Sequence, residues 1–303
     1  MDKSLKKQSH KENTARLKVT VKDNMKFNLF EKAKEKIIVV AHRGTFAGNI
    51  PCNTIPAYKT ALIEGADMIE IDVDMSRDGK LFIFHPQMES PFLGVKTRIP
   101  EMTGEEVKTL RYRNYDHTPT EYGLNTLEEV LEEFKGKCFI NVDKFWGHPE
   151  EIWREVKRHK MEDQILVKSE MNEKVINVLE NLAPEAAFMP IVSRTHPEHE
   201  RLKKSKINYV GVECLFFEEN NEVCSEEFIE KMHKDGTLTW ANAIIYNYKA
   251  QIAATHSDDT SIIGNPDDGW GWLARRGFDF IQTDWVSVMT KYLDKEGLLY
   301  RNK

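Results

Sequence analysis

Short apolar segments alternate with amphipathic segments along most of this chain. The apolar segments have the length and the β-branched or aromatic content of buried strands. Eight strands are predicted, at 37–41, 67–73, 138–143, 164–168, 187–192, 208–213, 237–243 and 278–283. Because helical patterns lie between most of them, the order of elements predicts an α/β fold with a largely parallel sheet.

Helix signals are clearest in two of the intervening segments. In TIPAYKTALIEG, Thr54 is placed to cap the first turn and Gly65 to end the helix. In NTLEEVLEEFKG, Thr126 and Glu129 have the spacing of a capping box, and the apolar residues share one face. A shorter helix is expected to begin in FNLFEKAKEK, from residue 27.

Eight strand–helix units favour a closed (β/α)8 barrel of the TIM type, which often forms one domain at this chain length. An open, doubly wound sheet is the alternative. Residues 1–24 are rich in lysine and nearly devoid of large apolar side chains, so we expect a flexible lead-in there. Residues 25–303 are expected to form a single barrel domain, since no repeat or Pro/Gly-rich linker interrupts them.

Composition narrows the class of protein. Of the 303 residues, 40% are hydrophobic and 30% charged, as in soluble globular domains, and no apolar run is long enough for a bilayer. A net charge of −6 gives no basic surface for nucleic acid. The N-terminus lacks the apolar core of a signal peptide, and the four cysteines show no CxxC spacing. We therefore expect a cytoplasmic protein with reduced thiols and no transmembrane segment.

Polar side chains stand where the predicted strands end, which is where the active sites of (β/α)8 barrels lie. His42 and Arg43 follow the first strand directly. Glu70 and Asp72 end the second strand and, being two residues apart, share one face. The later strands add Asp143, Lys168, Glu213, Trp240 and Asn242.

The segment 67–85 is predicted to fold as a hairpin. A turn at SRDG separates the strand that carries the acidic pair from a returning strand, KLFIFH. Similar numbers of residues on the two sides of the turn bring His85 back toward the acidic pair. Asp74 lies on the same strand face but precedes the turn, so we expect a turn or rim residue there.

Two carboxylates and two histidines at one rim indicate metal-assisted acid–base chemistry. Glu70 and Asp72 would repel each other in a barrel mouth unless a cation or an arginine offset their charge, so we expect a metal ion there. Carboxylate oxygens favour a hard cation such as Ca²⁺ or Mg²⁺. Imidazole titrates near neutrality, which suits His42 and His85 to proton transfer.

Several of these residues also have ordinary structural uses. A histidine after a strand can be a hydrogen-bonded structural residue, Lys144 or Lys168 can be a solvated lysine, and Trp240 can be a core side chain. The acid-rich segment 250–270 does not match a calcium-binding loop, because glycine and glutamate are not at the required positions. We expect it to be a long loop after the seventh strand that covers the barrel mouth.

Motifs in a specific order carry a family resemblance. The chain resembles the glycerophosphodiester phosphodiesterase family in HRG at 42–44, NT at 53–54, EID at 70–72 and the strand-ending His85. TLEEVLEEF is similar to the helix before the family's third barrel strand. The segment 269–285 is similar to its closing helix and strand, with the Thr283-Asp284 pair near the end.

The resemblance implies a TIM-like barrel with a small insertion after the second strand, placed here at about 86–122. It implies hydrolysis of glycerophosphodiesters to an alcohol and glycerol 3-phosphate with Ca²⁺ or Mg²⁺, the substrate's glycerol 2-hydroxyl attacking first and water then opening a cyclic phosphate. The site residues that it implies by position are His42 and His85 for acid–base catalysis, Glu70, Asp72 and Asp143 for the metal, and Arg43, Lys144, Lys168 and Trp240 for the phosphate or substrate.

The chain departs from the family's pattern at three places. Cys52 stands where a glutamate commonly precedes Asn-Thr, and Pro86 follows His85 where an aspartate is usual. Lys144 directly follows Asp143, one place earlier than in the family's acid-x-Lys motif. Either the strand bulges there or this lysine points away from the site, in which case the lysine of the next strand would supply the positive charge.

Two rival functions use the same constellation. Barrels similar to sphingomyelinase D or to phosphatidylinositol-specific phospholipase C act on lipid surfaces and would profit from exposed apolar loops and a secretion signal, neither of which is evident in this sequence. A catalytically silent barrel could instead bind a phosphorylated polyol or a lipid headgroup, although pure binding needs no acid–base pair. If the protein is a glycerophosphodiester phosphodiesterase, we expect a small-molecule substrate. The sequence does not indicate an oligomeric state.

Overall fold

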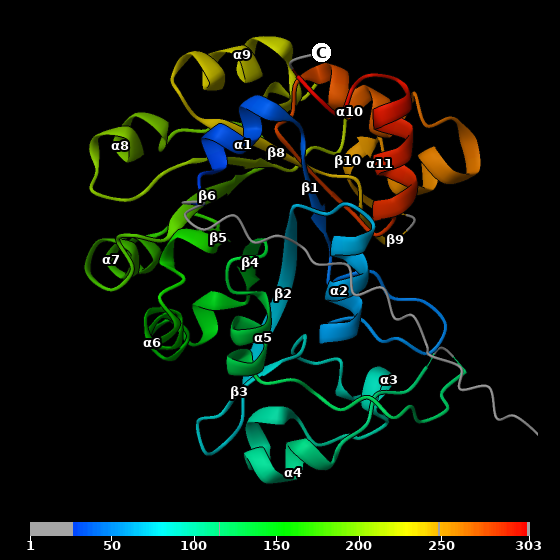
Figure 1. Ribbon diagram of the computed structural model, residues 1–303. Coiled ribbons are helices and arrows are strands. Elements are labelled where there is room, and N and C mark those ends of the chain that lie inside the picture. The colour runs from blue at the N-terminus through cyan, green and yellow to red at the C-terminus, as the bar shows by residue number, and fades with distance from the viewer. Residues whose placement is uncertain (1–26, 115, 248, 302–303) are drawn as a thin grey trace, which may run out of the picture.

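The structure, a computed structural model, describes residues 27–301 except 115 and 248; the predicted lead-in at 1–24 lies outside these residues. Eight parallel strands close into a barrel because the last of them pairs with the first. In order around the barrel they are β1 (Ile38–Ala41), β2 (Met68–Met75), β4 (Phe139–Asp143), β5 (Ile165–Ser169), β6 (Ala187–Val192), β7 (Gly211–Cys214), β8 (Leu238–Asn242) and β11 (Phe280–Thr283). The predicted TIM barrel is confirmed, and closure excludes the doubly wound alternative (Figure 1).

Helices cover the outside of the barrel. They are α2 (Ile55–Ile63), α5 (Leu127–Phe134), α6 (Pro149–His159), α7 (Glu173–Asn181), α8 (His199–Lys204), α9 (Glu226–Lys234), α10 (Trp270–Arg276) and α11 (Val286–Lys295). The predicted caps of two helices are confirmed: Thr54 caps α2, and Thr126 and Glu129 bond reciprocally at the start of α5. These bonds satisfy backbone N–H groups that the first turn leaves free.

A short helix, α1 (Leu29–Glu35), closes the amino end of the barrel. Its Leu29 and Ala33 pack into a core made largely of residues near the beginnings of the strands, among them Met68, Phe139 and Phe280. Phe27 contacts Phe139 edge to face, with ring centroids 5.0 Å apart. The core at this end of the barrel is therefore apolar, and the polar side chains that the sequence places at the strand ends lie at the opposite end.

The predicted hairpin forms between β2 and β3 (Leu81–Ile83), with Val73 opposite Ile83. Strand β2 continues through Asp74, so this buried residue lies in the strand and not in the turn. The following segment contains α3 (Glu89–Leu93), the 3-10 turn η1 (Ile99–Glu101) and α4 (Gly104–Thr109), seen at the foot of Figure 1. It has a small apolar core of its own, which includes Phe82, Phe84, Leu93, Ile99, Met102, Val107, Tyr112 and Leu124.

The long segment between β8 and α10 contains the antiparallel strands β9 (Ile245–Asn247) and β10 (Ala250–Thr255), then a π-helical turn, η5 (Thr260–Gly264). Residue Phe216, after β7, pairs with Ala253, which ties the two neighbouring loops together. Within the described part of the chain, no helix combines the length and the apolar character that crossing a lipid bilayer requires.

Asp279, just before β11, is a buried anchor on which stability should depend. Its carboxylate accepts hydrogen bonds from the backbone N–H of Thr239 (2.7 Å) and from His233 Nε2 (2.9 Å), and it pairs with Arg301 Nη1 (2.8 Å). Removing one partner from such a buried network costs about 3 kcal/mol or more. We expect Asp279→Ala to lower the free energy of unfolding in urea by that amount.

The exposed Glu180, at the end of α7, provides the matched control. Glu180→Ala should change the free energy of unfolding by less than about 0.5 kcal/mol. Equal free energies of unfolding for the two variants would contradict the anchoring role of Asp279.

Candidate active site

Three carboxylates meet at the carboxyl ends of β2 and β4. Glu70, Asp72 and Asp143 each offer one oxygen, and these oxygens lie within 4.8 Å of one another. Burial, and then the charge of Asp72, raise the pKa of Glu70 to about 8. Asp72 is fully buried, and its Oδ1 has no hydrogen-bond partner among the described residues.

This carboxylate cluster fits a divalent cation. One buried oxygen of Asp72 has no hydrogen-bond donor among the described residues, and burial together with the charge of Asp72 favours the protonated form of Glu70. The cluster therefore has room for more positive charge. Oxygen ligands from carboxylates are the donors that Ca²⁺ and Mg²⁺ prefer. Glu70, Asp72 and Asp143 are thus the residues that could hold a metal ion, as the sequence predicts.

The other oxygen of Asp72 is held by the segment after β1. Arg43 Nε lies 3.0 Å from Asp72 Oδ2, and Asn53 Nδ2 donates to the same oxygen at 2.8 Å. Tyr58 on α2 donates its hydroxyl to Asn53 Oδ1 at 2.8 Å. The sequence pointed to Asn53 only as part of the NT motif, and the chain of contacts from Tyr58 to Asp72 is visible only in the fold.

Left-handed backbone conformations produce this convergence. Arg43 has a φ of 57° and Asn53 a φ of 55°. Arg43 can therefore donate its backbone N–H to Glu70 Oε2 (2.9 Å) while its side chain reaches Asp72. Such angles are uncommon outside glycine and cluster where the surrounding structure enforces them.

Lys144 stands one residue earlier than the lysine of the family's acid-x-Lys motif, and the backbone explains how its side chain still reaches the site. Its backbone is also left-handed, with a φ of 59°, immediately after β4 ends. The turn brings its Nζ to 2.6 Å from Asp143 Oδ2 and to 3.9 Å from Asp72 Oδ1. Burial alone would raise the pKa of Asp143, but the Lys144 ammonium outweighs burial and lowers it. Lys144 therefore points into the site.

Lys168 and Trp240 form a second, more enclosed group. Lys168 Nζ pairs with Glu213 Oε1 at 3.0 Å and lies 3.9 Å from the centre of the Trp240 ring. Asn242 donates to the same oxygen of Glu213. The Trp240 ring is fully buried and stacks on Phe280. These contacts favour a core role for Trp240 over a contact with the substrate.

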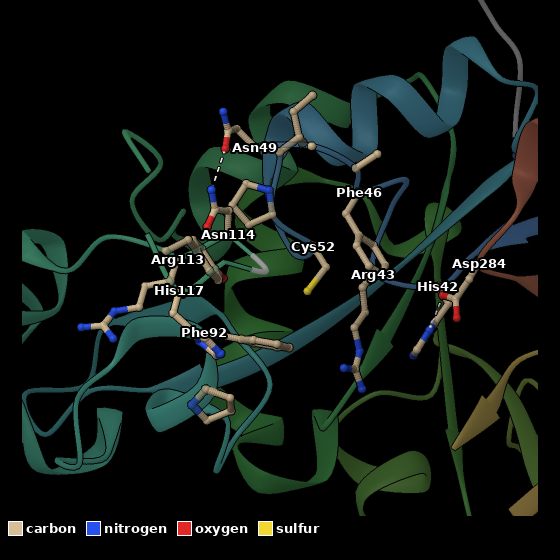
Figure 2. Close-up of a pocket in the computed structure, with 16 residues that line it drawn as sticks. His42, Arg43, Phe46, Asn49, Cys52, Phe92, Arg113, Asn114, His117 and Asp284 are labelled. Carbon is tan, nitrogen blue, oxygen red and sulfur yellow. Dashed lines mark hydrogen bonds and ion pairs between the residues drawn. The ribbon is translucent and has the colours of Figure 1, made fainter. Parts of the chain in front are cut away.

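His42 is oriented by an acid from the other end of the chain. Its Nδ1 lies 2.8 Å from Asp284 Oδ1, just after β11 (Figure 2). Burial by itself lowers the pKa of His42, but the hydrogen bond to Asp284 and the charge of Glu70 outweigh it, so the pKa is raised. Asp284 was noticed in the sequence only as part of the closing motif.

Asp284 is itself held by a buried carboxylate in the long segment after β8. Asp258 Oδ2 accepts the backbone N–H of Asp284 at 2.8 Å. Its Oδ1 accepts the Thr283 hydroxyl (2.7 Å) and the Trp270 indole N–H (2.6 Å). Burial raises the pKa of Asp258 to about 6. No pattern in the sequence singles out Asp258 from its acidic neighbours.

His85 is held differently. Its Nδ1 lies 2.9 Å from the carbonyl oxygen of Pro86. Because a carbonyl only accepts, this contact places a proton on Nδ1 and leaves Nε2 as the unprotonated nitrogen of the neutral ring. Burial lowers the pKa of His85. The two histidines therefore differ: His42 tends to be protonated and His85 tends to be neutral.

A cavity of about 400 Å³ opens beside His42 and Arg43 (Figure 2). Asp284, after β11, also lines it, and the rest of the lining comes from the segment after β1 and from the segment around α3: Phe46, Ala47, Gly48, Asn49, Ile50, Pro51, Cys52, Pro91, Phe92, Tyr112, Arg113, Asn114 and His117. Burial raises the pKa of the Cys52 thiol to about 12, so the residue that replaces the family's glutamate adds no charge.

Curated proteins that this chain resembles include glycerophosphodiester phosphodiesterases. A glycerophosphodiester phosphodiesterase of Bacillus altitudinis is 33% identical over 141 residues, which are 43% of this chain and 57% of that protein. One of Caldanaerobacter subterraneus is 29% identical over 157 residues, 49% of this chain and 64% of that protein. The matched part thus spans about three-fifths of the length of these curated relatives.

Solved structures share the fold. A glycerophosphoryl diester phosphodiesterase of Parabacteroides distasonis superposes with a TM-score of 0.72 at 17% identity, over 88% of this chain and 91% of that one. A phosphodiesterase of Oleispira antarctica, solved with sn-glycerol-3-phosphate, gives 0.59 at 21% identity, over 86% and 97%. The model of the glycerophosphoryl diester phosphodiesterase family matches residues 42–286, from His42 to Val286. Because this match covers most of the chain, the protein belongs to the glycerophosphoryl diester phosphodiesterase family.

Proposed function

We propose that this protein hydrolyses glycerophosphodiesters to an alcohol and glycerol 3-phosphate with the help of a divalent cation, Ca²⁺ or Mg²⁺. The observation that carries the proposal is the cluster of three acids at the barrel mouth with two differently held histidines beside it. His85 lies close enough to the cluster for the charge of Asp72 to act on its ring. The Oleispira antarctica relative, solved with sn-glycerol-3-phosphate, supports this product.

Positive charge is the first requirement of the reaction. A phosphodiester is an anion, and more negative charge develops on its non-bridging oxygens as the nucleophile attacks. When bound by Glu70, Asp72 and Asp143, a cation supplies Lewis-acid stabilisation of that charge. Arg43 and Lys144, which already contact these acids, add fixed positive charge for the phosphate. Lys168 is engaged by Glu213 and contributes through its field.

The hydrogen bonds of the two histidines suggest their roles. His85 is neutral with Nε2 free, so it serves as the base that takes the proton of the glycerol 2-hydroxyl. His42, whose protonated form Asp284 stabilises, serves as the acid that protonates the departing alkoxide. The roles reverse when water opens the cyclic phosphate. A silent binding barrel would have no use for such a pair.

Removing either imidazole should remove proton transfer. We expect His42→Ala and His85→Ala each to lower kcat for choline release from glycerophosphocholine by about 10²–10⁴-fold, with unchanged circular dichroism. His159→Ala, on the outer helix α6, is the control and should retain activity. Near-normal turnover in either site variant would refute the two-histidine mechanism.

Cation binding should depend on the acidic cluster. Dialysis against EDTA should abolish turnover, and added Ca²⁺ or Mg²⁺ should restore it. Because burial and the charge of Asp72 raise the pKa of Glu70 to about 8, titration calorimetry at pH 7 in buffers of different ionisation enthalpy should detect proton release on metal binding. Glu70→Gln should abolish that release and weaken binding.

A matched control comes from a second acidic group, Glu128, Glu132 and His159, on the outer surface. Glu128→Gln should bind the cation like the unaltered protein. Equal loss of binding in Glu70→Gln and Glu128→Gln would show that the ion binds elsewhere.

The pKa directions predict a bell-shaped profile of kcat/KM against pH. Activity should fall at low pH as the base His85 is protonated, below the usual range of a histidine, because burial lowers its pKa. It should fall at high pH as the acid His42 is deprotonated, above that range, because Asp284 raises its pKa. In Asp284→Asn the alkaline limb should therefore move to lower pH.

The exposed Asp259 provides the charge-matched control, and Asp259→Asn should leave both limbs in place. An unchanged alkaline limb in Asp284→Asn would exclude His42 as the general acid.

A further inference from the structure

Apart from His42, Arg43 and Asp284, none of the described residues that line the cavity takes part in the proposed chemistry. Two apolar walls enclose it: Phe46, Ile50 and Cys52 from the segment after β1, and Phe92 and Tyr112 from the segment around α3 (Figure 2). Its volume of about 400 Å³ lies in the range of sites that enclose drug-sized ligands, about 300–1,000 Å³. A glycerol unit and a small alcohol would leave much of such a site empty.

Charge excludes a cationic occupant. Asp284 is the single acid in the described lining, and its carboxylate is engaged by His42. The charged or titratable groups at the other end are basic, Arg113 and His117. A choline or ethanolamine group would find no counter-charge here, whereas a hydrocarbon chain would find matching carbon surface.

The cavity opens beside a rim with unusual exposed side chains. Phe46, Tyr246 and Trp285 are 46%, 67% and 47% exposed. Phe46 lines the cavity, and Trp285 directly follows Asp284, which also lines it. Phe217, Ile262 and Ile263, on the segments after β7 and β8, are exposed as well. Contrary to the expectation from the sequence, the segments that follow β1, β7, β8 and β11 thus carry exposed apolar side chains.

Exposed aromatic groups of this kind suit contact with a lipid surface, because an aromatic ring has both an apolar body and a polarisable face. The nearby acids Glu218, Glu219 and Asp259 and the net charge of −6 oppose an anionic surface. Zwitterionic or neutral lipids are therefore the compatible class.

From the apolar cavity and this rim we propose that the protein accepts monoacyl glycerophosphodiesters, that is lysophospholipids, with the acyl chain in the cavity. This proposal rests on the proposed function, since the same site performs the reaction. A chain on the glycerol 1-oxygen leaves the 2-hydroxyl free to attack. His85 takes the proton of this hydroxyl as its oxygen bonds to phosphorus. The bond from phosphorus to the headgroup oxygen breaks, and His42 protonates that oxygen as the alcohol leaves. Water then opens the ring, so that lysophospholipid and water give the alcohol and 1-acylglycerol 3-phosphate.

Chain length tests this assignment. Choline release is measured for glycerophosphocholine and for its 1-hexanoyl and 1-decanoyl esters, all as monomers, with the cation-loaded full chain. Each methylene that is fully buried is worth about fourfold in affinity, so four more methylenes should raise kcat/KM at least tenfold even when partly buried. In Ile50→Trp, which fills the cavity, the decanoyl-to-hexanoyl ratio should fall toward one.

Ile63→Trp makes the same change at a side chain that is 86% exposed on α2, outside the cavity, and should preserve the ratio. Calorimetric binding of the decanoyl ester to His85→Ala is measured as well, because it does not need turnover. If glycerophosphocholine is cleaved but the decanoyl ester is neither preferred nor bound, the acyl-chain proposal is wrong and the phosphodiesterase function stands. If nothing is cleaved but the decanoyl ester binds and Ile50→Trp abolishes binding, the proposed function fails and the acyl-chain cavity stands.

Discussion

Repulsion among buried carboxylates is the constraint on which this site depends. Oxygens of Glu70, Asp72 and Asp143 lie within 4.8 Å of one another at the barrel mouth, where Glu70 and Asp72 are shielded from water and Asp143 is partly exposed. The chain offsets part of this charge with Arg43 and Lys144, whose cationic groups contact Asp72 and Asp143. One oxygen of Asp72 still has no donor among the described residues, which is the place that a cation would fill.

The barrel makes this concentration of charge tolerable. Its amino end is filled by an apolar plug, with α1 packed on the first residues of the strands, so burial there supplies stability that the polar mouth does not. At the mouth, the short segments after β1 and β4 turn through left-handed conformations at Arg43, Asn53 and Lys144. These turns aim side chains back over the strand ends and place cationic groups where acids meet.

The two histidines have different hydrogen-bond partners, and their imidazole rings favour different protonation states. A carboxylate from the closing strand holds His42, and a backbone carbonyl holds His85. The carboxylate is fixed in turn by Asp258, which also accepts from Trp270 and Thr283. The segment after β8 therefore fixes Asp284, the partner of His42, while the segments after β1 and β3 line the cavity beside the site.

The sequence by itself determined the barrel and most of the acidic and basic groups at its mouth. Strand alternation, helix caps and the spacing of Glu70 and Asp72 are local properties, and a parallel barrel brings strand ends together wherever they stand in the chain. Only the tertiary structure decided which groups touch. The pairing of His42 with Asp284 joins residues 242 positions apart, and the return of Lys144 depends on one backbone angle. The exposure of the rim aromatics and the cavity beside Arg43 arise from packing between distant loops, which local patterns do not encode.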